Sequence, residues 1–124
     1  GTHGSTFGGN PLAMAAANAV LDVLFEDGFL DQVGGASERL VAGLEKLVAQ
    51  HAAVFEGVRG RGLMIGLKCK VANGDLVARL LEEDMLTVVA GDNVLRLLPP
   101  LNVADAEVDL ALEKLDVAAQ SMAG

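Results

Sequence analysis

Two adjacent hydroxyl side chains near the start of the chain could bind an anion. Ser5 and Thr6 lie in the glycine-rich stretch GSTFGGNP, just before a helix that is expected to start at Asn10. Hydroxyls and free backbone N–H groups in a glycine-rich turn can together cradle a phosphate or a carboxylate. In the alternative interpretation, Ser5 and Thr6 only shape the loop and cap the helix. Their spacing alone favours this alternative.

Arg96 is the second candidate, because an arginine is unusual in so apolar a strand. It lies in NVLRLLPPLNV, where Val94 and Leu98 would share its side of the strand. A guanidinium in such apolar surroundings needs an anion, and its planar fork fits a carboxylate through two parallel hydrogen bonds. The alternative is an arginine on an edge strand, either in water or paired with a nearby acid.

Other kinds of site find no support in the sequence. The stretch GRGLMIG has the wrong glycine spacing and the wrong context for dinucleotide binding, and no P-loop pattern occurs. Gly60 and Gly62 are instead expected to allow a tight turn or a bulge. His3, His51 and Cys69 have no partner at metal-ligand spacing. We therefore predict no metal site, and no pattern indicates a hydrolase-type nucleophile.

Composition limits the class of protein. The 124 residues are 52% hydrophobic but only 3% aromatic, which predicts a domain with an aliphatic core. The net charge of −8 argues against nucleic acid as a partner, since the phosphate backbone requires a basic surface. No apolar run reaches the roughly 20 residues of a membrane span, and the first residues do not resemble a signal peptide. We expect a cytoplasmic protein that does not bind a membrane.

The elements that would position these side chains follow from hydrophobic periodicity and turn residues. Helices are predicted over 11–27, 30–51, 75–84 and 104–121, and strands over 53–62, 63–71, 86–90 and 94–99. Asn73-Gly74 is expected to form a turn, and Gly91-Asp92-Asn93 a hairpin. This order predicts an α/β domain of the two-layer (α+β) type, with a short sheet covered by helices on one face.

The first predicted helix is unusually apolar. Between Leu12 and Phe25 only Asn18 and Asp22 are polar, and helices that are apolar all round are buried on every side. We expect this helix to pack against protein outside the chain, in another domain or in a partner subunit. A central core helix is the alternative. A domain boundary is expected within residues 28–35.

Three stretches resemble one enzyme family. GTHGSTFGGNPLAMAAANAVLDVL, VRGRGLMIGL and DNVLRLLPPLNV are similar to blocks of the class III, pyridoxal-phosphate-dependent aminotransferases, in the acetylornithine and ornithine aminotransferase branch. The resemblance extends over nearly all of the chain. It implies a fold-type I architecture, in which residues 1–30 are the tail of the large cofactor-binding domain with an interdomain helix. Residues 31–124 would be the small C-terminal domain.

The resemblance also implies roles for the three candidates. Thr6 would bind the phosphate of pyridoxal 5'-phosphate, reaching across a homodimer interface. Ser5 would lie beside it, at the phosphate or at the substrate, and Arg96 would hold the α-carboxylate of the amino-acid substrate. The lysine that forms a Schiff base with the cofactor would lie upstream, because no lysine here matches its position. The chain would be the C-terminal part of a longer enzyme, with no catalytic residue and no activity of its own.

The implied reaction is transfer of an amino group between N-acetylornithine and 2-oxoglutarate, a step of arginine biosynthesis. Ornithine, succinylornithine and 4-aminobutyrate are alternative amino donors. Two hypotheses of another class stay open. The chain could be a small-anion binding module that uses the loop 4–10, or an oligomerisation domain that buries residues 12–25 against another chain.

Overall fold

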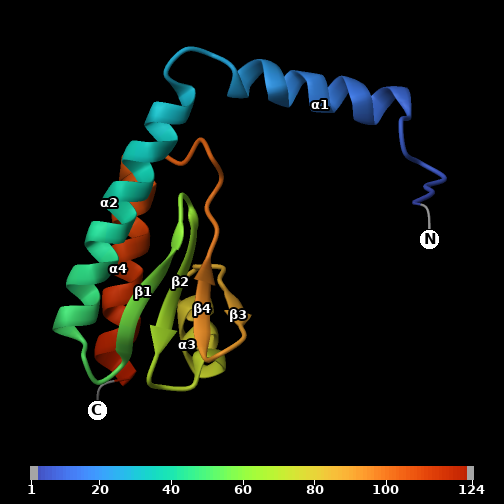
Figure 1. Ribbon diagram of the computed structural model, residues 1–124. Helices are drawn as coiled ribbons and strands as arrows, with labels where there is room; N and C mark the ends of the chain where they lie inside the picture. Colours follow the sequence, from blue (N-terminus) through green and yellow to red (C-terminus); the bar gives the residue numbers. More distant parts are fainter. Residues whose placement is uncertain (1–2, 123–124) are drawn as a thin grey trace. The chain divides into compact units, whose positions relative to one another are not determined.

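The structure is a computed structural model that describes residues 3–122. The chain divides into two compact units, residues 1–32 and 33–124, which we describe separately. Figure 1 labels their helices and strands in chain order.

The first unit holds the glycine-rich loop and helix α1, Pro11–Leu24. The Asn10 side chain caps this helix, because its Oδ1 accepts a hydrogen bond of 2.9 Å from the backbone N–H of Ala13. Pro11 occupies the first turn, where its missing N–H is no loss. Gly28, at φ 83°, follows the helix and permits the left-handed backbone that redirects the chain. The predicted cap and start of this helix are confirmed.

Helix α1 buries none of its side chains. Leu12 is 81% exposed, and Phe25, just past the helix, is 78% exposed. A continuous apolar surface of this kind marks a site that contacts another part of a protein. Within its own unit the helix has no core to enter, so packing against protein outside the chain stays our prediction.

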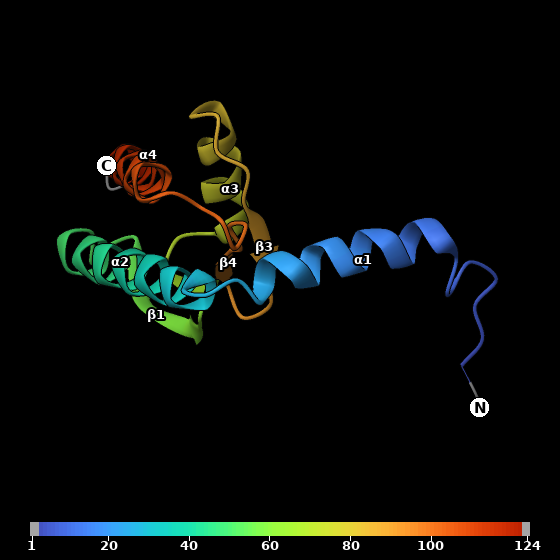
Figure 2. The same ribbon diagram turned by 90° about the horizontal axis from the view of Figure 1, so that it is seen from above.

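The second unit is a four-stranded antiparallel sheet with three helices. The first of these helices, α2, begins in the first unit. Its elements are α2 (Phe29–Gln50), β1 (Phe55–Arg61), β2 (Met64–Cys69), α3 (Asn73–Glu82), β3 (Val88–Ala90), β4 (Val94–Leu97) and α4 (Asp105–Met122). The strand order is β1-β2-β4-β3, and every neighbouring pair is antiparallel. Figures 1 and 2 show α2, α3 and α4 on one face of this sheet. The predicted two-layer α/β domain is confirmed.

The core lies between the sheet and the helices, and it is aliphatic, as the composition predicts. Alternate residues of β2 and β4 point into it, and Ile65, Leu67, Leu95 and Leu97 are at most 5% exposed. Leucines of α2 and α3 and small aliphatic residues of α4 complete the same core. In the described part of the second unit no helix covers the opposite side of the sheet, which we call the open face.

Helices α2 and α4 lie side by side and run in the same direction. The residues in contact follow the same order along both helices: Arg39 contacts Asp109, Gly43 contacts Leu112, and His51 contacts Asp116. A Cβ on Gly43 would lie 2.2 Å from Leu112 Cδ1, so the missing side chain lets the two helices approach closely. This helix pair supports the core side of the sheet.

Three predicted turns have different outcomes. Gly60 has φ 140°, and a Cβ there would lie 2.2 Å from the Met64 carbonyl oxygen, so the β1–β2 hairpin requires glycine. The turn at 91–93 joins β3 to β4, as predicted. The turn predicted at Asn73-Gly74 is wrong, because Asn73 is the first residue of α3. Its side chain bonds to carbonyls of the β3–β4 hairpin instead of forming a local turn.

Candidate functional site

The loop before α1 is held together by local hydrogen bonds. Ser5 Oγ accepts a bond of 2.9 Å from the backbone N–H of Gly8, and the Asn10 amide donates to the Phe7 carbonyl at 2.6 Å. Gly9 has φ 74°, a backbone conformation that side chains disfavour. Ser5 therefore shapes the loop, while the helix cap is Asn10. The bond to Gly8 uses the Ser5 oxygen, and the Ser5 proton stays available to donate.

Thr6 lies at an exposed bend of the same loop. Within residues 3–122 its hydroxyl takes part in none of the hydrogen bonds that order the loop. An exposed hydroxyl on a glycine-rich turn can donate to an anionic oxygen. The loop thus offers two hydroxyl donors, one from Ser5 and one from Thr6, and their binding of a phosphate stays a prediction.

Arg96 lies on β4, at the open face of the sheet. It pairs with Gly66 of β2 and Val88 of β3, so β4 is an internal strand and only the edge-strand part of the alternative is wrong. Val94, on the same side of β4, is 3% exposed, but Arg96 itself is exposed. Leu98 lies past the end of β4 and is 61% exposed. The expected apolar surroundings are incomplete, because the open face has no second layer to cover the guanidinium.

No carboxylate forms an ion pair with Arg96 in the part of the chain that the structure describes. The basic side chains of the described ion pairs are those of Arg39, His51, Arg59, Lys68 and Arg79. The alternative in which a nearby acid is the partner of Arg96 is therefore not met here. An exposed guanidinium gains little free energy from a surface ion pair, so the lack of one costs the fold little. It can bind the planar carboxylate of a ligand instead.

Arg96 is one of four cations on the open face. The sheet register places Arg59, Arg61 and Lys68 on the same side, so this face holds four of the nine lysines and arginines in the chain. Arg59 and Arg96 both pair with Gly66 and flank it in one row across three strands. The Val94 side chain fills the space above Gly66, since a Cβ on Gly66 would lie 2.8 Å from Val94 Cγ1. In a chain of net charge −8, this face is the natural place for an anion to bind.

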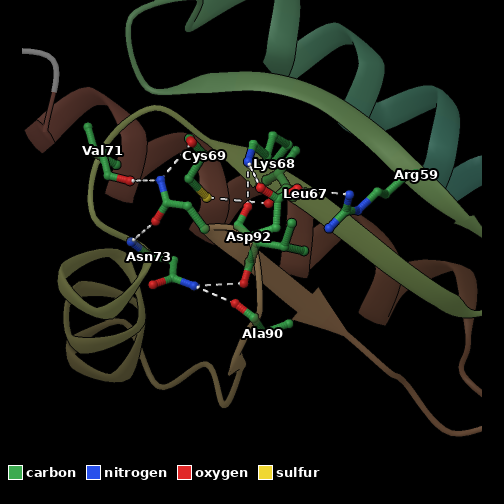
Figure 3. A network of polar contacts seen from close by, with 10 residues as sticks. Arg59, Leu67, Lys68, Cys69, Val71, Asn73, Ala90 and Asp92 are labelled. Carbon is green, nitrogen blue, oxygen red and sulfur yellow. Dashed lines mark hydrogen bonds and ion pairs between the residues drawn. The ribbon is translucent and has the colours of Figure 1, made fainter.

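Asp92 forms ion pairs with two of these cations. One of its carboxylate oxygens lies 2.7 Å from Lys68 Nζ, and the other lies 3.1 Å from Arg59 Nη1 (Figure 3). The hydrogen bond and charge of Lys68, followed by those of Arg59, hold the pKa of the Asp92 carboxyl below its ordinary range. Among residues 3–122, Arg61 and Arg96 are thus the cations of the open face without an ion pair.

We expect Asp92→Asn to destabilise the protein at neutral pH and to have little effect in acid. Because the pKa of Asp92 is lower in the folded chain, its carboxylate stabilises the fold above the unfolded pKa of about 3.9. This contribution is lost as the pH falls through the lower, folded pKa. Urea-unfolding midpoints of wild type and variant should differ equally at about pH 7 and pH 5 and converge as the pH falls through the folded pKa.

Asp27→Asn is the matched control for this titration. Asp27 is exposed and forms no ion pair within the described residues, so its removal should leave the midpoint nearly unchanged at every pH. A constant difference between wild type and Asp92→Asn down to the lowest pH would contradict the ionic role of Asp92.

Two asparagines that hold the β3–β4 hairpin were not recognised from the sequence. Asn73, at the start of α3, donates from its side chain to the Ala90 carbonyl (Figure 3). Its backbone N–H donates to the side chain of Asn93 in the turn, and that side chain donates to the Cys69 carbonyl. Asparagine favours turns, and that was the only signal in the sequence. Side-chain bonds between segments about 20 residues apart cannot be read from spacing.

The described residues offer anion-binding groups and little else that could do chemistry. Within residues 3–122, no three His, Cys, Asp or Glu side chains are placed to hold a metal ion. In the same range, no helix is long and apolar enough to cross a membrane. What remains is a pair of hydroxyls on one loop and a guanidinium on the open face, groups that bind a phosphate and a carboxylate.

Comparison with known proteins gives the family. A sequence model of the class-III aminotransferases matches residues 1–119, and the chain belongs to this family. The resemblance found in the three sequence stretches is therefore confirmed.

Individual relatives point to one branch. The chain is 54% identical, over 116 residues, to acetylornithine aminotransferase 1 of Bradyrhizobium diazoefficiens, covering 94% of this chain and 29% of that protein. Its fold matches N-acetylornithine aminotransferase from Stenotrophomonas maltophilia with a TM-score of 0.83 at 35% identity, over 92% of this chain and 32% of that one. Ornithine delta-aminotransferase of Plasmodium falciparum gives a TM-score of 0.87 at 28% identity, over 99% and 32%. The chain spans 29% to 32% of the length of these relatives.

Proposed function

We propose that the chain is the C-terminal part of an acetylornithine aminotransferase, which transfers an amino group from N-acetylornithine to 2-oxoglutarate. The observation that carries the proposal is Arg96, an exposed guanidinium with no ion pair among residues 3–122, on a sheet of matching fold. Relatives named acetylornithine aminotransferase, 47% to 54% identical to this chain, support the choice of substrate.

Arg96 would bind the α-carboxylate of the substrate. A guanidinium matches a carboxylate through two parallel N–H···O bonds, which fix direction as well as distance. The internal position of β4 holds the Arg96 backbone on both sides, through Gly66 and Val88. Such a fixed anchor orients the substrate before it reacts and lowers the entropic part of the barrier.

Thr6 and Ser5 would hold the phosphate of pyridoxal 5'-phosphate. The loop fits this group, because it presents two hydroxyl donors and small residues that let a phosphate approach the backbone. When bound, the cofactor supplies an electron sink for negative charge at the substrate carbon that carries the transferred amino group. The part played by this chain is binding and orientation. The essential lysine is expected in the region of the relatives that this chain does not span.

We place residues 1–30 with the large cofactor-binding domain and residues 31–124 in the small domain of a cytoplasmic homodimer. The exposed apolar side chains of α1 support this arrangement, since they need a protein surface to cover them. In a homodimer, Thr6 would reach the cofactor bound to the partner subunit. Residues 12–25 would then be buried by the large domain or at the subunit interface.

Ornithine is the second candidate donor, favoured by the TM-score of 0.87 with an ornithine delta-aminotransferase. Both donors carry the same α-carboxylate, so Arg96 would bind them equally well. They differ at the α-nitrogen, which is charged in ornithine and an uncharged amide in N-acetylornithine, while the distal amine that is transferred is common to both. Discrimination between them therefore depends on residues around the α-nitrogen.

The test uses the full-length enzyme loaded with pyridoxal 5'-phosphate and measures glutamate formation from 2-oxoglutarate. N-acetylornithine should give a kcat/KM at least about tenfold above that of ornithine, because an unpaired charge in a site built for an amide is costly. A higher kcat/KM with ornithine, succinylornithine or 4-aminobutyrate would replace the proposed donor. No transfer from any of the four would overturn the proposal, and stabilisation by inorganic phosphate alone would then favour an anion-binding module.

A further inference from the structure

The turn between β3 and β4 has a backbone that needs outside support. Asp92 and Asn93 are consecutive non-glycine residues with φ of 61° and 51°. L-residues populate this left-handed region sparsely, although aspartate and asparagine tolerate it best. Two such residues in succession persist only where the surrounding structure holds them.

The Asn93 side chain supplies that support. Its Nδ2 donates to the carbonyls of Cys69, at 2.7 Å, and Val71, at 2.8 Å. Its Oδ1 accepts from the backbone N–H of Asn73 at 2.9 Å. One half-buried side chain therefore joins the hairpin turn to the end of β2 and to the start of α3.

The Asn73 side chain closes the same hairpin from α3. Its Nδ2 donates to the carbonyls of Ala90, at 3.1 Å, and Val94, at 2.9 Å. Ala90 and Val94 are partners across the β3–β4 ladder, so this amide bridges both strands next to the turn. We call Asn73 and Asn93 the asparagine clamp.

The clamp acts close to Arg96. Val94, which accepts from Asn73, lies two residues before Arg96 on the same side of β4. A shift of one residue in the register of β4 would turn Arg96 toward the core, because side chains alternate along a strand. With three residues in β3 and four in β4, the strands are too short for length alone to secure the register.

We propose that the asparagine clamp positions Arg96 for the substrate carboxylate. Asn93 fixes β4 against the end of β2, and Asn73 fixes β4 against β3. Neither side chain bonds to Arg96, so both act as positioning residues. This inference rests on the proposed function, in which Arg96 binds the α-carboxylate.

The test measures carboxylate binding in the full-length enzyme with its cofactor. The probe is desamino-N-acetylornithine, which keeps the carboxylate but has no amino group to react. Asn93→Gly tolerates the positive φ and removes all three side-chain bonds, and we expect it to raise the Kd of the probe about tenfold. Asn93→Asp keeps the shape of the side chain but cannot donate hydrogen bonds, and it should raise the Kd of the probe similarly. Asn102→Gly, at an exposed loop asparagine, should leave the Kd unchanged.

A double-mutant cycle with Arg96→Ala separates positioning from general destabilisation. If the clamp acts through Arg96, Asn93→Gly should add no further loss of probe affinity in the Arg96→Ala background. An equal loss in both backgrounds would overturn the inference, and so would an unchanged Kd for Asn93→Gly while Arg96→Ala weakens binding. An unchanged Kd for Arg96→Ala itself would instead overturn the role of Arg96 in the proposed function.

Discussion

Arg96→Ala is expected to lower kcat/KM for N-acetylornithine about 100-fold in the full-length enzyme. Arg96 is exposed and carries no ion pair among residues 3–122, so its full hydrogen-bonding capacity is available to a substrate carboxylate. Losing a charged, bidentate contact of this kind costs about 3 kcal/mol, which corresponds to roughly two factors of ten. The affinity for pyridoxal 5'-phosphate should stay unchanged. Steady-state kinetics and a cofactor titration of the same variant measure both quantities.

Two variants serve as controls for this prediction. Arg61→Ala removes a charge from the same open face, also from an exposed arginine, and should reduce kcat/KM only slightly. Arg96→Lys keeps the charge but not the planar fork, so its activity should fall between those of wild type and Arg96→Ala. Equal losses for Arg61→Ala and Arg96→Ala would mean that the net charge of the face matters and that Arg96 has no specific role.

Thr6→Val is expected to weaken binding of pyridoxal 5'-phosphate about 10- to 100-fold. Valine keeps the branched shape of threonine but removes the hydroxyl, and one hydrogen bond to an ionised group contributes about 1.5 to 3 kcal/mol. Because Thr6 takes no part in the bonds that order its loop, the substitution should leave the loop intact. Titration of the cofactor-free enzyme with pyridoxal 5'-phosphate, followed by absorbance, measures the Kd.

Thr6→Ser is the matched control, since it retains the hydroxyl and loses only a methyl group. Its Kd for the cofactor should lie within about twofold of the wild-type value. If Thr6→Ser and Thr6→Val weakened cofactor binding equally, the methyl group and not the hydroxyl would make the contact. The proposed phosphate role of Thr6 would then have to be abandoned.

The elements of the fold could be predicted because each has a local cause. The Asn10-Pro11 pair starts α1 as expected, since the asparagine caps the helix and the proline fits its first turn. Alternating apolar residues in 64–69 and 94–97 became the buried side of β2 and β4. The predicted start of α3 was wrong. Asn73 has turn propensity, but its side chain bonds to a distant hairpin and the residue begins the helix.

The candidate site could be predicted only in part. Arg96 stood out because it interrupts an apolar strand, and the structure places it on the open face. Its exposure to water was considered only in the alternative of an edge strand, since sequence does not tell which side of a small sheet lacks a second layer. Asp92 was recognised only as a turn residue, because its partners Lys68 and Arg59 lie 24 and 33 residues away. Long-range partners of this kind follow from strand order, which the periodicity does not give.

The two edges of the sheet limit how copies of this protein can associate. Strand β3 forms one edge and has three residues, too few to serve as a template for a further strand. Strand β1 forms the other edge. Its pairing with β2 is interrupted between Phe55 and Gly57, and the rest of the strand carries two exposed arginines. Irregular pairing and like charges both oppose edge-to-edge growth. Extension of the sheet into edge-to-edge aggregates is therefore disfavoured at both edges.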